Sequence, residues 1–428
     1  MELINKIFKK GEKFGDIQVA ISKENTLSLE YKGNKIDNSE ESSVSEIAIR
    51  IIKGNKFGFS KTTDLMRWED CLKNAVKIMK VSEPFEHKLP VPEIKKTNFV
   101  SGVYSKEVAE ADEKFLFEKG KELISKPKAK ELNIPHASVE RNIIENIFAV
   151  SGEEINERYT YFGANIECNA GESLGSEFRV EHGFFDASEI GDQAMRLCLE
   201  GRNPQKAPTE KMDLVMDYNA FSRLVGKILV PSLSGDSVAF GKSYLGDKQN
   251  KKVFSEKLSV VDDGRMKNGL FSTRFDAEGV PTQKTNLIDD GVVKNFMFDS
   301  YTAKMLNQKT TGNCSTLEKV PSVSPSNFIM AEGDFKNSEI VEETKRGIVS
   351  HYLMGTHVAN EITGDASVAI ENSYLIENGQ KKHPVKQAMI HLNLFDALKN
   401  LEVVGNKIRQ DGNIGVPWVK FSNVQIIG

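Results

Sequence analysis

The residues best suited to hold a metal ion or move a proton in this 428-residue chain are its seven histidines. A helical zinc-peptidase site needs two histidines one turn apart and a glutamate poised as a base. His351 and His357 are six residues apart, so a regular helix could not turn both toward one ion. Two other pairs have helical spacing but lie near predicted strands or turns, which favours structural or exposed roles: His136 with Glu140, and His182 with Asp186.

The four cysteines are isolated and widely spaced, and they form no CxxC pair. This pattern indicates reduced thiols. Small, semi-buried side chains are the favoured interpretation, well ahead of a catalytic role. The positions are Cys71, Cys168, Cys198 and Cys314. No Ser-His-Asp or Cys-His site can be assigned, because such residues meet only in three dimensions.

The segment Gly235–Ser243 (GDSVAFGKS) looks like a phosphate-binding loop at first glance. It has one residue too many between its glycines, and the geometry that cradles a phosphate depends on that spacing. We interpret the segment as a flexible loop, and nucleotide binding is not favoured.

Composition excludes several broad classes. The chain is 39% hydrophobic and 28% charged, as in soluble globular proteins. A net charge of −4 and a pI near 6.1 give no basic footprint for nucleic acid. No apolar run is long enough for a signal peptide or a membrane span. We therefore expect a cytoplasmic protein that contacts neither membrane nor nucleic acid directly.

The first part of the chain alternates in hydrophobicity, which predicts an antiparallel sheet with one wet face. The expected strands are separated by Gly-containing turns, while the polar stretch Asn38–Ser43 predicts a mobile loop. A helix is expected before the strands and another after them, capped by Thr63 or Asp64. These elements are a helix at 2–15, strands at 17–21, 26–31 and 46–52, and a helix from about 64 to 80.

The proline-rich stretch Glu83–Thr97 predicts an extended crossing segment. Further elements follow in the order helix, strands, helix, at 105–125, 139–185 and 187–200. Gly and Pro at 201–204 end the last helix. The main domain boundary is placed within 205–211.

The second half opens with the apolar strand Met212–Met216 and a helix at about 219–229. Leu258–Ala303 predicts a β meander, because Asp-Gly turns separate its apolar runs. A helix and a strand are expected within 338–354. Because strands and helices do not alternate as βαβ units, we predict an α+β fold. Its domains are 1–205, possibly two subdomains with a break near 83–104, and a β-rich domain at 206–428.

Several spaced blocks in the second half resemble the TldD/PmbA family, whose members are associated with metal-dependent peptide processing. They occur in the family's order and cover much of that half, whereas the first half matches mainly in its pattern. The blocks are VVDDG at 260–264, FDAEGVPT at 275–282, FDSYTA at 298–303, TGN at 311–313, MGTHVANEITGD at 354–365, YLIENG at 374–379 and Pro384-Val385.

This chain departs from the catalytic branch of that family. The catalytic branch carries HExxxH on a helix early in the C-terminal half, and a cysteine near the C-terminus as a further zinc ligand. The corresponding segment here, Asp217–Gly235, has neither His nor Glu, and Val403–Gly428 has no Cys. The resemblance is therefore to the PmbA (TldE) branch, which pairs with a zinc-bearing subunit.

The resemblance implies no cofactor in this chain and zinc in a partner subunit. It implies a homodimer, or a heterodimer with an HExxxH-bearing TldD-like paralogue, that acts on a peptide. Two alternatives stay open. The chain could be a self-sufficient metallopeptidase with an unrecognised site, for example one built from His351, His357 and Glu361. It could also be a regulatory or scaffold protein, for instance one acting near DNA gyrase.

The candidate peptide-binding residues lie in two places in the second half. The first is the glycine-rich block with Gly355, Asn360, Thr363, Gly364 and Asp365; the second is the expected strand that carries Val292 and Phe296. We expect the peptide to add as a strand there, since main-chain hydrogen bonds ignore side chains. The alternatives are that the block is only a tight turn, and that these strands are already paired on both sides.

Overall fold

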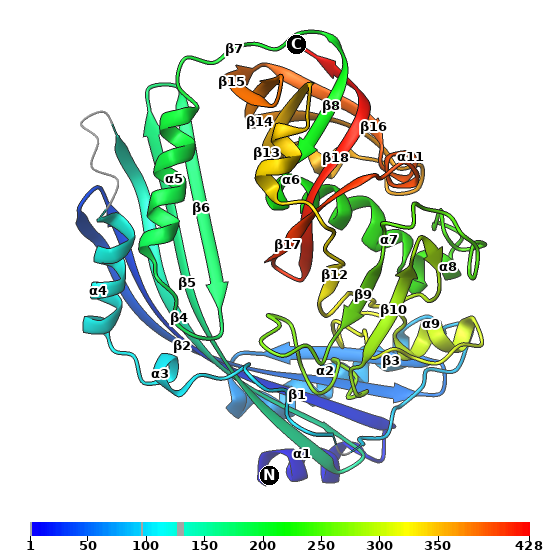
Figure 1. Ribbon diagram of the computed structural model, residues 1–428. Coiled ribbons are helices and arrows are strands. Elements are labelled where there is room, and N and C mark those ends of the chain that lie inside the picture. The colour runs from blue at the N-terminus through cyan, green and yellow to red at the C-terminus, as the bar shows by residue number, and fades with distance from the viewer. Residues whose placement is uncertain (1, 96, 126–131) are drawn as a thin grey trace.

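Two β-sheets, one from each half of the chain, organise the computed structural model, which describes residues 2–95, 97–125 and 132–428 (Figure 1). The first sheet has six strands and the second has twelve. Helices lie against both, and strands and helices do not alternate as βαβ units. The prediction of an α+β fold is confirmed.

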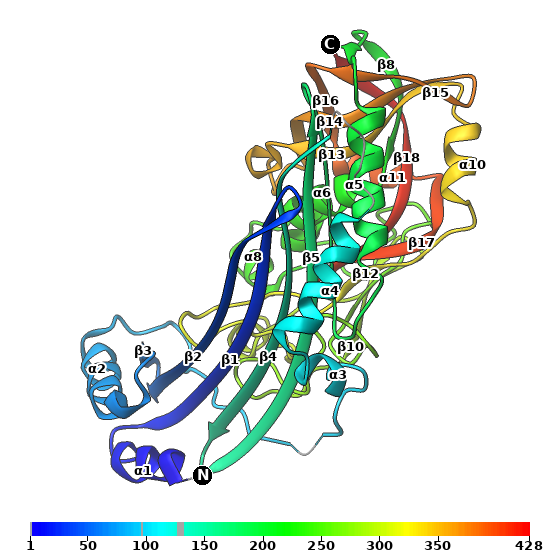
Figure 2. The same cartoon turned by 90° about the vertical axis from the view of Figure 1, so that its left-hand side faces the viewer.

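The first sheet is antiparallel, long and strongly curved (Figure 2). Four of its five neighbouring pairs are joined by two-residue turns, and only β1 and β4 are far apart in the chain. At one turn both Ser151 and Gly152 have positive φ (51° and 85°), the conformation that suits a two-residue hairpin. In spatial order the strands are β3 (Lys56–Thr62), β2 (Lys35–Lys53), β1 (Asp16–Lys32), β4 (Asn133–Val150), β5 (Glu153–Ala170) and β6 (Ser173–Glu181).

Helices cover one face of this sheet near both of its ends. Two apolar clusters lie between the helices and the sheet, and β1 contributes buried residues to both. These residues are all odd-numbered, from Ile17 to Tyr31, and alternate residues of a strand lie on the same face. The helices therefore cover one face of the sheet. The even-numbered Gln18 and Ala20 meet the C-terminal half on the other face. The helices are α1 (Glu2–Gly11), η1 (Leu65–Arg67), α2 (Trp68–Val81), α3 (Lys106–Ala109), α4 (Glu113–Ile124) and α5 (Ser188–Glu200).

Five strands of the second sheet pair in a closed ring, because β16 bonds to both β14 and β18. The ring is β8 (Glu210–Met216), β13 (Arg346–Met354), β14 (Asp365–Glu377), β16 (Ala388–Asn393) and β18 (Ile414–Ile427). Other strands extend from it: β7 (Gln205–Lys206), β9 (Val260–Asp263), β10 (Lys284–Asp289), β11 (Val292–Val293), β12 (Phe328–Met330), β15 (Gln380–Lys386) and β17 (Val403–Asp411).

Short helices pack against both faces of this sheet. α6 passes into a π-helical turn, η2, which is buried in the main core with Phe221 and Ile228. In chain order these elements are α6 (Tyr218–Leu224), η2 (Val225–Leu229), α7 (Val230–Ser232), α8 (Gly235–Ala239), α9 (Ser300–Met305), α10 (Asn337–Glu342), η3 (Thr356–Val358) and α11 (Leu394–Lys399). Across the described residues, no helix combines the length and the apolar composition needed to cross a membrane.

Buried carboxylates hold the loops of the expected meander. Only β9, β10 and β11 are strands there, and the stretch between β9 and β10 is irregular. Asp276 accepts backbone N–H groups from Glu278, Val280 and Cys314. Asp262 accepts from Ser326 N at 2.8 Å. The acidic residues of these sequence blocks therefore satisfy the backbone donors of buried loops.

Three local expectations were wrong. Asn38–Ser43 is strand, because its backbone pairs with β1 although its side chains are exposed. The start of the phosphate-loop-like segment is α8. The expected single helix at 105–125 is two, since Asp112 caps a new helix by accepting from Phe115 N at 2.8 Å.

Candidate functional site

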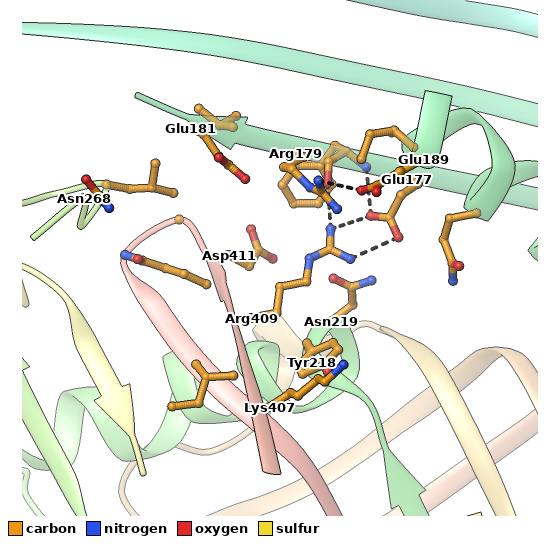
Figure 3. A pocket seen from close by; sticks show the side chains of 18 of the residues that line it. Glu177, Arg179, Glu181, Glu189, Tyr218, Asn219, Asn268, Lys407, Arg409 and Asp411 are labelled. Carbon is orange, nitrogen blue, oxygen red and sulfur yellow. Dashed lines mark hydrogen bonds and ion pairs between the residues drawn. The ribbon is translucent and has the colours of Figure 1, made fainter. Parts of the chain in front are cut away.

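A large cleft, of about 1840 Å³, lies between the six-stranded sheet and the C-terminal half (Figure 3). β6 and α5 form one wall. The start of α6, the β17–β18 hairpin, His351 of β13 and Lys381 of β15 form the other. Acidic and basic side chains line it in near-equal number, so the cleft offers no strong field of one sign.

An ion pair spans this cleft. Arg409 of β17 donates from Nη1 to Glu177 Oε2 of β6 at 3.0 Å, and from Nη2 to the Phe178 carbonyl at 2.6 Å. The Glu177 side chain is only 4% exposed. Burial raises the pKa of the neighbouring Asp411, against the effect of Arg409. Figure 3 shows these groups pointing toward one another from the two walls.

A buried Asp–His pair lies at one side of the cleft. Asp217 Oδ1 caps α6 by accepting from Asn219 N at 3.0 Å, and its Oδ2 accepts from His351 Nδ1 at 2.7 Å. This fixes the proton on Nδ1 and leaves Nε2 to face Lys381 Nζ at 3.5 Å. The surrounding protein displaces water and lowers the pKa of Lys381. The pair can orient a proton or exchange one with a neighbouring group.

The segment Asp217–Gly235 does not fit a zinc ion. Lys227 Nζ forms an ion pair with Glu361 Oε2 at 2.8 Å, and the Arg223 guanidinium lies over the Tyr352 ring at 4.1 Å. Both are cations, and neither is a zinc ligand. Across residues 2–95, 97–125 and 132–428, no three or more His, Cys, Asp or Glu side chains are arranged to hold a metal ion.

The histidines named from the sequence are not brought together. His351 bonds to Asp217, Glu361 bonds to Lys227, and His357 lies on the separate turn η3. His182 is buried, with its ring nitrogens on the carbonyls of Thr160 and Gly269 at 2.9 and 3.0 Å. These contacts are structural.

The glycine-rich block forms a turn that is closed by its own hydrogen bonds. Asn360 Oδ1 accepts from Ile362 N and Thr363 N at 2.9 and 3.1 Å. Asp365 accepts from Thr363 Oγ1 at 2.7 Å. Gly364 has φ +86°, and a Cβ there would lie 2.5 Å from Phe395 Cδ2, so this glycine serves packing. Gly355 (φ +83°) has open space around it. None of the five candidates lines the large cleft.

Most of the backbone at both places is paired within this chain, which favours the alternative to an added strand. β14, which begins at Asp365, is paired with β16 and β15 along one side, and with β13 along the other from Ala369 onward. β11, which contains Val292, is paired with β10 and on its other side with Lys251 and Lys252. Phe296 is buried in the core. This chain's own backbone therefore occupies most of these edges, and the added strand stays a prediction.

Sequence reasoning missed the main contacts of the cleft. Glu177 and Arg409 are 232 residues apart in the chain, and nothing local marks either one. Asp217 carried a usable signal, since an Asp before a helix predicts an N-cap. Its contact with His351 arises only because β8 and β13 are parallel neighbours.

Known proteins resemble this chain over nearly its whole length. Residues 209–428 match the PmbA/TldA metallopeptidase C-terminal domain, and residues 18–79 match domain 1 of the same proteins. An uncharacterized protein of Methanocaldococcus jannaschii is 30% identical over 98% of both chains. TldE of Thermococcus kodakarensis has a TM-score of 0.89 at 23% identity, over 100% of both chains.

A Thermotoga maritima protein described as a modulator of a DNA gyrase has a TM-score of 0.88 at 23% identity, over 100% of this chain and 99% of that one. At these identities the structural likeness supports the fold alone. The family follows from the domain matches and from the full-length relative. This chain belongs to the PmbA/TldD metallopeptidase family.

Proposed function

We propose that this chain is the metal-free subunit of a TldD/PmbA-type peptidase. In this proposal it binds peptide and completes a zinc-bearing companion chain that carries HExxxH. The observation that carries the proposal is the ion pair between Lys227 and Glu361. Lys227 lies in the segment that corresponds to the zinc helix of the catalytic branch, and Glu361 reaches it from the 354–365 block.

The chemistry of that ion pair supports the proposal. A zinc peptidase uses three protein ligands, a bound water and a base. Here an ammonium group holds the nearby carboxylate, and two unit charges of like sign about 4 Å apart repel by roughly 4 kcal/mol at an effective dielectric near 20. A divalent cation would therefore have to displace Lys227 and would then lack ligands.

The cleft supports a role in holding peptide. Its size exceeds the 300–1,000 Å³ or so of a small-ligand pocket. Its mixed charge suits a polypeptide better than a polyanion such as DNA. The resemblance to paired subunits supports a companion chain, whether a second copy or a paralogue.

The test measures zinc and peptide hydrolysis for the chain purified without a histidine tag, alone and mixed with an HExxxH-bearing companion from the same cell. We expect substoichiometric zinc and no hydrolysis alone, and faster hydrolysis by the mixture than by the companion alone. A companion with its HExxxH glutamate changed to glutamine is the control and should be inactive. One zinc per chain, with chelator-sensitive hydrolysis in the absence of a companion, would make this chain a peptidase itself.

A regulatory role near DNA gyrase is the second candidate. It rests on the description of the Thermotoga maritima protein of the same fold as a gyrase modulator. Capture of gyrase by this chain but not by its zinc-bearing companion would support it. The balanced charge of the cleft gives it no further support.

A further inference from the structure

A second cavity lies beside the large cleft and has no role in the proposed function. Its volume is about 600 Å³, within the range of small-ligand pockets, about 300–1,000 Å³. Ala20 and Ser22 of β1 line it, so it lies on the sheet face opposite the helices. Loops of the C-terminal half, at 271–277 and 312–318, border it from the other side. The two halves of the chain therefore form a space of the size that a small molecule needs.

The floor of the second cavity is preformed, because its polar groups already have partners. Asn313 donates from Nδ2 to Asp262 Oδ2 at 2.7 Å, and its Oδ1 accepts from Thr311 Oγ1 at 2.6 Å. Cys314 N donates to Asp276 Oδ2 at 3.0 Å. All five residues are buried. A fully bonded polar network is rigid, so the floor presents a fixed shape to a ligand.

Six aromatic side chains, from both halves of the chain, line the second cavity. An aromatic ring offers apolar surface to a ligand, and its electron-rich face also attracts a cation. Such a wall suits an organic ion with an apolar body and a positive charge better than it suits a hydrated metal ion. The six residues are Phe59, Phe148, Tyr159, Tyr161, Phe271 and Phe275.

The charged groups that line the second cavity are mainly negative. Glu46, Glu157 and Glu318 are carboxylates, whereas Lys61 is the single cation among the lining residues that the structure describes. Lys61 Nζ already pairs with Glu46 Oε2 at 3.4 Å. Within the described parts of the chain, Glu157 and Glu318 have no ion-pair partner. Burial raises the pKa of a fourth lining carboxyl, Asp276, so it is left out of this balance. A cationic ligand would complete the charge of the cavity.

Glu157 is the carboxylate that is held most firmly at the cavity wall. Its Oε2 accepts from Tyr159 OH and from Thr273 Oγ1, both at 2.6 Å, and its Oε1 accepts from Arg274 N at 2.8 Å. Tyr159 and Thr273 also line the cavity. The Arg274 guanidinium is engaged elsewhere, since Nη2 donates to the Thr97 carbonyl at 2.8 Å. The negative charge of Glu157 is therefore fixed in position and left for a ligand.

We propose that the second cavity binds a small organic cation, an ammonium or guanidinium group on an apolar or aromatic body. The cationic group lies beside Glu157, and the body lies against Phe148 and Phe275. A metal ion fits less well, because the described residues contain no group of three or more His, Cys, Asp or Glu side chains that could hold one. The inference goes beyond the proposed subunit role and does not depend on it. Because Tyr161 and Phe271 line both spaces, the bound cation also lies against the wall of the large cleft.

Two probes of the same shape test for the charge. Phenyltrimethylammonium and tert-butylbenzene differ only in one atom, nitrogen or carbon, and only the first is charged. Ligand-detected NMR titrations with the full chain, without a companion, give both dissociation constants. We expect the cation to bind at least about tenfold more tightly, because aromatic faces and carboxylates stabilise its charge. A merely apolar cavity prefers the hydrocarbon, since burying an unpaired charge is costly. Equal binding, tighter binding of tert-butylbenzene, or no binding of the cation would overturn the proposal.

Variants that remove one charge locate the site. Glu157→Gln keeps the size of the side chain and should weaken binding of phenyltrimethylammonium at least about tenfold, with little change for tert-butylbenzene. Glu318→Gln, at an exposed position, should weaken it about twofold to threefold, because water screens that charge. This second variant keeps the test decisive if Glu157→Gln does not fold. Glu145→Gln is the matched control and should bind as the wild type does, since Glu145 pairs with Arg158 at 2.9 Å and does not line the cavity.

Glu181→Gln distinguishes the second cavity from the large cleft, which Glu181 lines. We expect this variant to bind phenyltrimethylammonium normally. A loss of affinity in Glu181→Gln would place the cation in the cleft and overturn the proposal, as would unchanged affinity in both Glu318→Gln and a folded Glu157→Gln. None of these results bears on the subunit role, which is decided by zinc content and by hydrolysis with a companion.

Discussion

Arg50 of β2 and Glu278 form a buried ion pair between the two halves of the chain, with Nη2 and Oε1 3.1 Å apart and side chains 1% and 3% exposed. Gln18 of β1 accepts from Arg50 Nε and donates to the Glu278 carbonyl. Glu278 also accepts from Ser300 N at 3.2 Å. The Arg50 guanidinium thus ties the six-stranded sheet to the loop of Glu278, and the Glu278 carboxylate in turn holds the start of α9.

Removing one member of this pair should destabilise the protein strongly. Arg50→Met leaves a buried carboxylate without its cation, which costs about 3–5 kcal/mol. Arg50→Met with Glu278→Gln removes both charges and should cost less than Arg50→Met alone. Urea unfolding of these two variants and of Glu278→Gln alone measures this. Strictly additive costs of the two changes would contradict the coupling.

The stability of the fold should depend on pH through Asp262. Burial raises the pKa of Asp262 to about 6, whereas an unfolded aspartate titrates near about 3.9. Between about pH 4 and pH 6 the folded chain keeps a proton that the unfolded chain has released. The stability that Asp262 adds is therefore complete below about pH 4 and lost as the pH rises through about 6.

Asp262→Asn isolates this contribution. The variant should gain about 2 kcal/mol in unfolding free energy relative to the wild type as the pH rises from about 4 to about 7. Denaturant unfolding across this range measures the difference between the two proteins. A difference that stays constant, or that shrinks with rising pH, would show that Asp262 titrates normally.

The four thiols should be nearly inert in the folded protein. All four are buried and unpaired, and burial raises the pKa of each, in Cys168 to about 12. Because the thiolate is the reactive form, labelling by a disulfide reagent should be at least about 100-fold slower in native than in denatured protein. One fast-reacting thiol in the native chain would identify a local opening.

Two glycines of the 354–365 block should respond differently to alanine. Gly364→Ala puts a Cβ 2.5 Å from Phe395 Cδ2 at φ +86°, so we expect a loss of about 2–4 kcal/mol. Gly355→Ala, at φ +83° with nothing nearby, is the matched control and should cost only about 1–2 kcal/mol from backbone strain. Thermal unfolding distinguishes them. Equal losses would mean that the Phe395 contact is unimportant.

Local signals in the sequence located most elements. Asp64 caps the element that follows it, as predicted, and positive-φ glycines mark the hairpins. These signals work because they act within a few residues. The strand at Asn38–Ser43 was missed because only pairing with β1, across the hairpin, fixes it.

The site was far less predictable than the fold. In the sequence, Glu177 looks like an ordinary strand residue and Arg409 like an ordinary exposed one. Their pairing becomes evident only in the fold, where the β17–β18 hairpin lies beside β6. The block at 354–365 drew attention through its glycines, whose main role is to shape a turn. A charged side chain carries no local mark of the partner it will meet, so such pairs emerge only from the fold.

The five-stranded ring also determines when the C-terminal half can fold. Met216 of β8 pairs with Val419 of β18, about two hundred residues later, so a growing chain cannot close the ring until β18 has emerged from the ribosome. Until then β8 and β16 each lack one partner strand, and such distant pairings form slowly. Open strand edges associate with other chains. Newly made protein is thus exposed to aggregation for as long as this closure takes, and these two edges are where a chaperone would protect it.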